Sequence, residues 1–145
     1  MKDTVTLGVQ AGDERAGQTT EPHFMSLRKL LASVCTGPYS TEVDEFALIL
    51  RIDGDGWHWD FEGCQKLRRS KKDRYITIDI GVPRQRWDGV SSDKIREYFS
   101  KNVELALTMC IEKLKKDKAN IDGDALLRDY QKVKEQYLLK RGKSG

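Results

Sequence analysis

Alternating apolar and polar positions in the middle of the chain predict a small β-sheet. Residues 46–52 (FALILRI) have apolar side chains at every second position, which is the period of a strand. Residues 53–56 (DGDG) have the composition of a tight turn, and residues 57–63 (WHWDFEG) resume the alternation. A third alternating run, 75–82, ends at Pro83, which cannot donate to a strand ladder. Together these segments predict a β-hairpin followed by a third antiparallel strand.

The remaining apolar positions predict one short strand and three helices. Residues 5–9 alternate like an edge strand, and residues 11–22 have the Gly, Thr and Pro content of a loop. Helical spacing of three and four then follows over 22–34. A long amphipathic helix is predicted from Ser91 or Ser92, as its N-cap, to a lysine cluster at 113–118. A last helix is predicted after the Asp-Gly-Asp sequence at 122–124.

These elements predict an α+β fold. We expect a small antiparallel β-meander with amphipathic helices packed on one face, since a sheet with one apolar side must be covered. The two long helices lie at the C-terminal end of the sequence. The length predicts a single domain over residues 1–145, with a disordered tail at residues 142–145.

Composition narrows the functional classes without naming one. The chain has 145 residues and a formal net charge of +3, which is too small to indicate what kind of partner it binds. The apolar runs are shorter than the roughly 20 residues of a membrane span, and the first residues lack a secretory pattern. We therefore expect a soluble cytoplasmic protein that binds no membrane. Cys35, Cys64 and Cys110 are too widely spaced for a paired-cysteine zinc site.

The candidate chemical sites lack a complete set of residues. Residues 53–64 begin like a calcium loop, but Trp57, His58 and Cys64 stand where that loop needs an oxygen ligand, a glycine and a glutamate. His58 with Asp60 could act as a general acid or base, but no nucleophile motif accompanies them, which favours a surface ion pair. Cys64 has no neighbouring group that would form its thiolate. We therefore expect no catalysis, no metal and no cofactor.

Charge is distributed unevenly along the chain and predicts two binding surfaces. Residues 53–62 contain four acidic and no basic side chains, whereas basic side chains are densest from Lys66 to Arg74. Separate surfaces of opposite charge can steer and orient a protein partner. The candidate partner-binding residues are Asp53, Asp55, His58, Asp60, Glu62, Arg68, Arg69, Lys71, Lys72, Arg74, Arg84, Arg86 and Trp87.

The tryptophans leave alternatives open. Trp57 and Trp59 alternate with polar residues, which favours the core over a contact role. Trp87 beside Arg84 and Arg86 has the cationic and aromatic character of a nucleic-acid surface. The basic stretch is explained equally well as a charged loop that protects a sheet edge. A small basic nucleic-acid-binding protein is therefore the alternative to a protein-binding module.

Residues 37–89, followed by a long amphipathic helix, resemble small bacterial immunity proteins of polymorphic or contact-dependent toxin systems. The resemblance implies a cytoplasmic α+β protein that binds a toxin domain and blocks its active site without chemistry of its own. Immunity proteins against nucleases are often acidic, so a nuclease target would move the contact to residues 53–62. Our prediction is a non-enzymatic immunity protein that neutralises a cognate bacterial toxin.

Overall fold

The computed structural model describes residues 3–144, with side chains through Leu139. Within these residues, strands and helices combine in an α+β fold, as predicted. In chain order the elements are β1 (Val5–Ala11), α1 (Glu14–Val34), β2 (Glu45–Ile52), β3 (Gly63–Ser70), β4 (Tyr75–Val82), the 3-10 helix η1 (Arg84–Arg86), α2 (Ser92–Lys116) and α3 (Gly123–Ser144).

The sheet is mixed, with strand order β1-β2-β4-β3. β1 is parallel to β2 and β2 is parallel to β4, while β3 is antiparallel to β4. Leu48 of β2 lies opposite Leu7 of β1 and Ile78 of β4. The predicted antiparallel meander is therefore wrong, because β4 lies between β2 and β3 and these two strands form no hairpin.

Side-chain character explains this strand order. β2 and β4 both bury an aliphatic or aromatic residue at every second position, so they bury the most apolar surface at the centre of the sheet. β3 carries Lys66, Arg68 and Arg69, and a bulge interrupts its pairing between Gln65 and Arg68. A charged, bulged strand is suited to an edge. The chain leaving β2 therefore crosses the end of β4 to reach the outer position.

Residues 57–62 form a loop and not the predicted strand, and most of the predicted basic loop is strand β3. The alternation of Trp57, Trp59 and Phe61 consequently has no sheet to follow. Trp57 is 60% exposed, and the other two rings are half-buried. The prediction of a core position is therefore wrong for Trp57.

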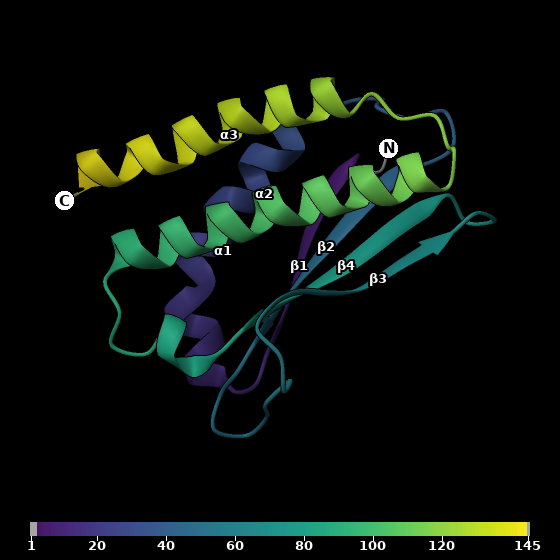
Figure 1. The fold of residues 1–145 in the computed structure, drawn as a ribbon. Helices are drawn as coiled ribbons and strands as arrows, with labels where there is room; N and C mark the ends of the chain where they lie inside the picture. The colour runs from purple at the N-terminus through teal and green to yellow at the C-terminus, as the bar shows by residue number, and fades with distance from the viewer. Residues whose placement is uncertain (1–2, 145) are drawn as a thin grey trace.

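All three helices lie on the same side of the sheet, as predicted (Figure 1). α1 packs on β1, whereas α2 packs on β4, β3 and β2. α3 packs on α1 and α2 and forms the layer farthest from the sheet. The core lies between the sheet and the first helical layer, where Phe46, Ile78 and Phe99 are buried. Among the described residues, no helix lies over the opposite face of the sheet (Figure 1).

Helix boundaries follow capping residues. α1 begins at Glu14, where the sequence pattern predicts a loop, because the side chain of Asp13 accepts a hydrogen bond from Ala16 N. Pro22, the predicted start, lies inside this helix. The prediction for α2 is confirmed, since Ser91 is its N-cap and accepts from Lys94 N.

Two further predictions concern the membrane and the C-terminus. Among the described residues, the helices are too short or too polar to cross a lipid bilayer. α3 extends to Ser144 and so includes most of the predicted tail 142–145, while Gly145 lies outside the described residues.

Candidate partner-binding surface

Three connections meet at the carboxyl ends of the parallel strands β1, β2 and β4. They are Gly12–Asp13 between β1 and α1, residues 53–62 between β2 and β3, and the segment from Pro83 to Ser91 between β4 and α2. Because the three strands run in the same direction, their carboxyl ends lie side by side at one end of the sheet. In open sheets of parallel strands, ligands bind at the carboxyl ends of the strands. We call residues 53–62 the crossing loop.

Backbone and side-chain hydrogen bonds fix the first half of the crossing loop. Asp53 N donates to Val82 O at 2.9 Å, and Gly54 N donates to Trp57 O at 3.0 Å. Trp59 N donates to Asp53 Oδ1 at 2.9 Å. These bonds turn the chain away from the ladder immediately after β2, so the alternating tryptophans do not continue the strand.

Asp13 joins the crossing loop to the start of α1. Its Oδ1 accepts from Ala16 N at 2.8 Å, and its Oδ2 accepts from Asp55 N at 2.6 Å. These two hydrogen bonds lower the pKa of the Asp13 carboxyl from its ordinary value. A Cβ added at Gly12 would lie 2.5 Å from both Gly54 N and Trp57 O. The two backbones are therefore in contact, and glycine is the residue that permits this approach.

The fixed loop presents Trp57 to solvent. The ring of Trp57 meets that of Trp59 edge to face, with 6.4 Å between the centroids. His58 is also exposed, and its Nδ1 lies 3.6 Å from Asp53 Oδ2. Asp60 is exposed and has a φ of 50°. The predicted pair of His58 with Asp60 is therefore replaced by one with Asp53, because these residues are not on a strand face.

Basic side chains from the neighbouring connection neutralise part of the crossing loop. Arg84 forms an ion pair with Asp55 and a second one with Asp88 at 3.1 Å. Arg15, in the first turn of α1, pairs with Asp88 at 3.0 Å. The predicted acidic loop and the predicted arginines 84 and 86 are thus brought together, and the loop is less acidic than its sequence suggests.

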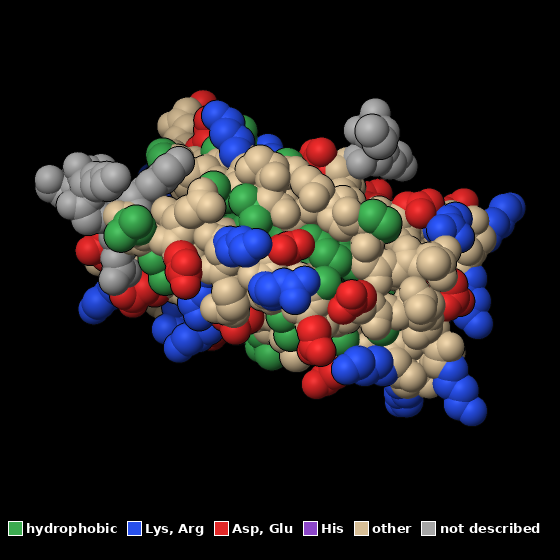
Figure 2. Space-filling view, turned by 90° about the horizontal axis from the view of Figure 1, so that it is seen from above, with side chains coloured by type: hydrophobic (Ala, Val, Ile, Leu, Met, Phe, Trp, Pro, Cys, Tyr) green, Lys and Arg blue, Asp and Glu red, His purple; other side chains and the backbone are tan. Residues whose placement is uncertain are grey.

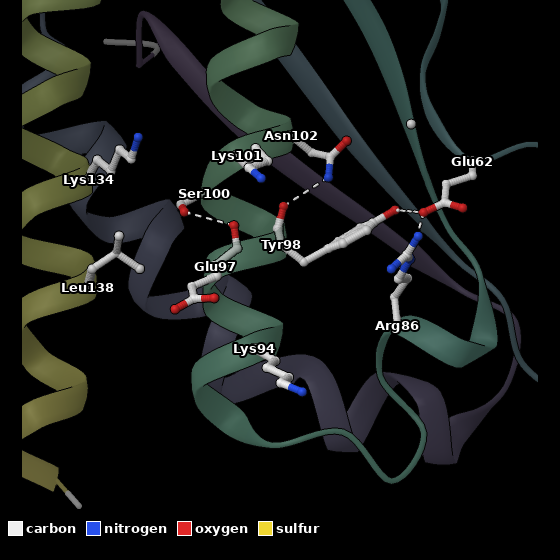
Figure 3. A pocket seen from close by; sticks show the side chains of 11 residues that line it. Glu62, Arg86, Lys94, Glu97, Tyr98, Ser100, Lys101, Asn102, Lys134 and Leu138 are labelled. Atoms are coloured by element: carbon white, nitrogen blue, oxygen red, sulfur yellow. Dashed lines mark hydrogen bonds and ion pairs between the residues drawn. The ribbon is translucent and has the colours of Figure 1, made fainter.

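Arg86 forms a second cluster at the other end of the loop. Its Nε donates to Glu62 Oε2 at 2.7 Å, and its guanidinium lies 5.2 Å from the centroid of the Tyr98 ring. The Tyr98 hydroxyl donates to the same carboxylate oxygen at 2.9 Å. The hydrogen bond from Arg86 is the main cause that lowers the pKa of Glu62. Figure 3 shows these three side chains meeting beside α2.

The predicted basic surface is divided between two faces of the sheet. Arg69 faces the helices, with only 5% of its side chain exposed, and pairs with Asp117 at 3.0 Å. Arg68 lies on the opposite face, where it pairs with Asp79 at 3.1 Å. Arg69 is therefore unavailable to a partner, contrary to the prediction.

The turn between β3 and β4 lies at the other end of these strands from the crossing loop (Figure 1). Lys71 and Lys72 are exposed there, and Arg74 pairs with Asp44 at 2.8 Å. On the α3 side of the molecule, basic and acidic side chains are mixed (Figure 2). Neither region forms an extended surface of one charge.

Trp87 belongs to the core and not to a binding surface. It is 1% exposed, and its Nε1 donates to Asp53 O at 2.9 Å. The guanidinium of Arg15 covers the ring at 5.0 Å from its centroid. The prediction that Trp87 contacts a partner is therefore wrong: its ring is buried beneath the crossing loop, and it supports that loop from below.

The cysteines show no sign of activation. Cys64 Sγ donates to Asn102 O at 3.3 Å, and burial raises the pKa of its thiol to about 11. Burial also raises the pKa values of Cys35 and Cys110, each to about 12. Such thiols remain protonated and are poor nucleophiles at neutral pH. Among the described residues, no three His, Cys, Asp or Glu side chains are grouped to hold a metal ion.

Comparison with protein families gives this surface a functional context. The family Immunity protein 44 matches residues 16–136. The chain belongs to this family. Comparisons with curated proteins and with solved structures found no match. In the immunity protein, the matched region includes the crossing loop, Arg86 and α2, whereas Gly12, Asp13 and Arg15 lie just before it.

Sequence reasoning missed several features of the immunity protein's surface, and two of them had a local signal. The DGDG sequence at 53–56 indicated a turn, and its glycines could also have signalled close backbone approach. Asp13 before Glu14 was an available helix-start signal. Tyr98 carried no local signal, because its partners Glu62 and Arg86 are remote in sequence.

Proposed function

We propose that this immunity protein neutralises a cognate bacterial toxin by binding to it, and that the crossing loop with Trp57 is the centre of the contact. Membership of the Immunity protein 44 family supports the toxin as partner. Binding without catalysis agrees with the protonated thiols and with the lack of a complete catalytic set in the sequence. We propose the bacterial cytoplasm as the place of binding.

The observation that carries the location is an exposed tryptophan on a fixed loop. Tryptophan is among the residues that contribute most at protein interfaces, where it fills a pocket of the partner. Trp57 is 60% exposed, while the backbone around it is held by Asp13, Val82 and Trp59. A preorganised side chain loses less conformational entropy when it binds. The loop therefore offers a large contact area at low entropic cost.

The nucleic-acid alternative has less support. It requires Trp87 as a stacking platform and free arginines beside it, but Trp87 is buried and Arg84 is paired with two carboxylates. The exposed tryptophan lies on a loop that also exposes Asp60. A carboxylate exposed on the same loop repels phosphate, so this surface suits a protein better than a polyanion.

The test is co-expression of the chain with the toxin domain encoded beside it. We expect the two proteins to co-purify and the chain to protect cells from the toxin. Trp57→Ala should weaken the complex by about 30-fold or more, the loss typical of a central interface residue. Tyr75→Ala is the matched control, because it removes another exposed aromatic ring at the opposite end of the sheet.

Failure of the wild-type chain to bind the toxin would refute the proposed function. Binding that is unaffected by Trp57→Ala, or that is weakened equally by Tyr75→Ala, would refute the proposed location. Thermal denaturation of both variants verifies that they fold, which we expect because both rings are exposed.

A further inference from the structure

A groove opens from the end of the crossing loop and passes over the first half of α2. Its volume is about 720 Å³, which lies within the range of ligand sites. α2 contributes residues from Lys94 to Asn102, α3 contributes Lys134 and Leu138, and Glu62 and Arg86 form the opposite side. Figure 3 shows the lining side chains arranged around α2. Because Glu62 belongs to both, a partner seated on the loop can continue into the groove.

Basic side chains outnumber acidic ones in the lining of the groove, although one of them, Lys134, is paired with Glu104 at 2.9 Å. The lining contains Lys94, Lys101, Lys134 and Arg86, and its acidic members are Glu62 and Glu97. Glu62 is already bound by Arg86 and by the Tyr98 hydroxyl. Lys94 and Lys101 are both exposed on α2, and the hydrogen bond that Lys94 donates to Ser91 comes from its backbone and not from its ammonium group. The lysines therefore bring positive charge that the lining does not balance.

Arg86 is preorganised for a second carboxylate. Glu62 binds its Nε, and the Tyr98 ring lies against its guanidinium at 5.2 Å from the centroid. Because Glu62 is bound through Nε, the two terminal nitrogens of Arg86 are suited to binding a further carboxylate in a two-point arrangement. An arginine held on both sides loses little entropy when it binds a carboxylate.

We propose that this groove receives an acidic segment of the toxin, with Lys94, Lys101 and Arg86 as its contacts. This rests on the proposed function, since it names the kind of toxin surface that continues from Trp57. Charge complementarity favours an acidic polypeptide, and the groove's continuity with the exposed tryptophan favours a protein over a free anion. Nucleic acid fits less well because Asp60 is exposed on the same loop.

The experiment measures the affinity of the full chain for the same toxin domain by titration calorimetry, at low and high salt. Lys94→Glu/Lys101→Glu should weaken binding by about tenfold or more at low salt, and by less at high salt, because salt screens exposed charges. Lys115→Glu/Lys116→Glu is the control: it reverses two exposed lysines of the same helix, about 27 Å farther along it. We expect this control to change the affinity less than twofold.

The outcomes distinguish the groove from the loop. If Trp57→Ala weakens binding but Lys94→Glu/Lys101→Glu does not, the groove proposal is wrong and the proposed function stands. Equal effects of the two lysine pairs would also overturn the groove, because they would reflect net charge alone. If the wild-type chain does not bind the toxin, both proposals fail. A toxin with its acidic segment changed to lysines should bind Lys94→Glu/Lys101→Glu better than it binds the wild-type chain.

Discussion

The contact between Gly12 and the crossing loop makes a prediction that depends on no partner. Gly12→Ala would place a Cβ at 2.5 Å from Gly54 N and at the same distance from Trp57 O. Both atoms belong to backbone, so no flexible side chain can move aside. The substitution must therefore displace the loop or the end of β1, and with it the hydrogen bond from Gly12 N to Ile52 O at 2.7 Å.

The magnitude follows from the cost of overpacking, which is about 1–3 kcal/mol. For a chain of this size, about 1 kcal/mol shifts the midpoint of thermal unfolding by roughly 2–4 °C. We therefore expect Gly12→Ala to lower the midpoint by about 2–12 °C. Gly17→Ala, inside α1, is the matched control. Its added Cβ would meet only the Ala11 Cβ, at the ordinary contact distance of 3.5 Å. There the loss of a helical glycine should stabilise the protein by up to about 1 kcal/mol.

Differential scanning calorimetry of the two variants measures the opposite shifts, and toxin binding supplies a second measurement. Gly12→Ala should also weaken the complex, although Trp57 is retained, because the loop is no longer held in place. If Gly12→Ala unfolds at the same temperature as the wild-type chain, the loop can move freely, and the argument for a preorganised Trp57 is wrong.

Two further predictions concern buried side chains. Trp87→Ala should destabilise the protein by about 3–5 kcal/mol in denaturant unfolding; a much smaller loss would show that the ring is not part of the core. Burial, and then the nearby Arg96, lower the pKa of His23 in the folded protein. As the pH falls, the His23 imidazole is therefore protonated in the unfolded chain before it is protonated in the folded protein. The free energy of unfolding should fall as the pH drops below about 6.5, and level off below the folded-state pKa. His23→Gln should reduce this dependence between pH 7 and 5.5, and an unchanged slope would contradict the assignment.

The sequence pattern predicts the elements of this fold better than their arrangement. The alternation in β2 and β4 and the helical spacing in α2 depend on neighbours within a few residues, and all three elements occur close to the predicted positions. Strand order depends on which segments meet across the whole chain. The DGDG turn favoured a hairpin locally, but burial of two strongly apolar strands at the centre outweighed it. Local turn chemistry could not reveal that competition.

The charge of the candidate site was likewise difficult to predict from local sequence. The acidic residues of the crossing loop and the arginines that follow β4 belong to segments of opposite net charge in the sequence. In the fold, these two segments meet at the carboxyl ends of the three parallel strands. There Arg84 pairs with Asp55, and Arg86 pairs with Glu62. Under the proposed function, recognition depends on the side chains that this pairing leaves exposed.

What remains exposed is an aromatic ring followed by a groove with a basic lining. The ion pairs around the crossing loop are themselves exposed, so each contributes little to stability in water. Their stronger effect is on geometry: Arg84 ties the loop to the segment after β4, and Glu62 orients Arg86 toward the groove. The same carboxylates that made the segment look like an acidic contact therefore act mainly to hold Trp57 and Arg86 in place. Neutralising Glu62 should then disturb binding through Arg86, whereas neutralising Asp60 should act only through its own charge.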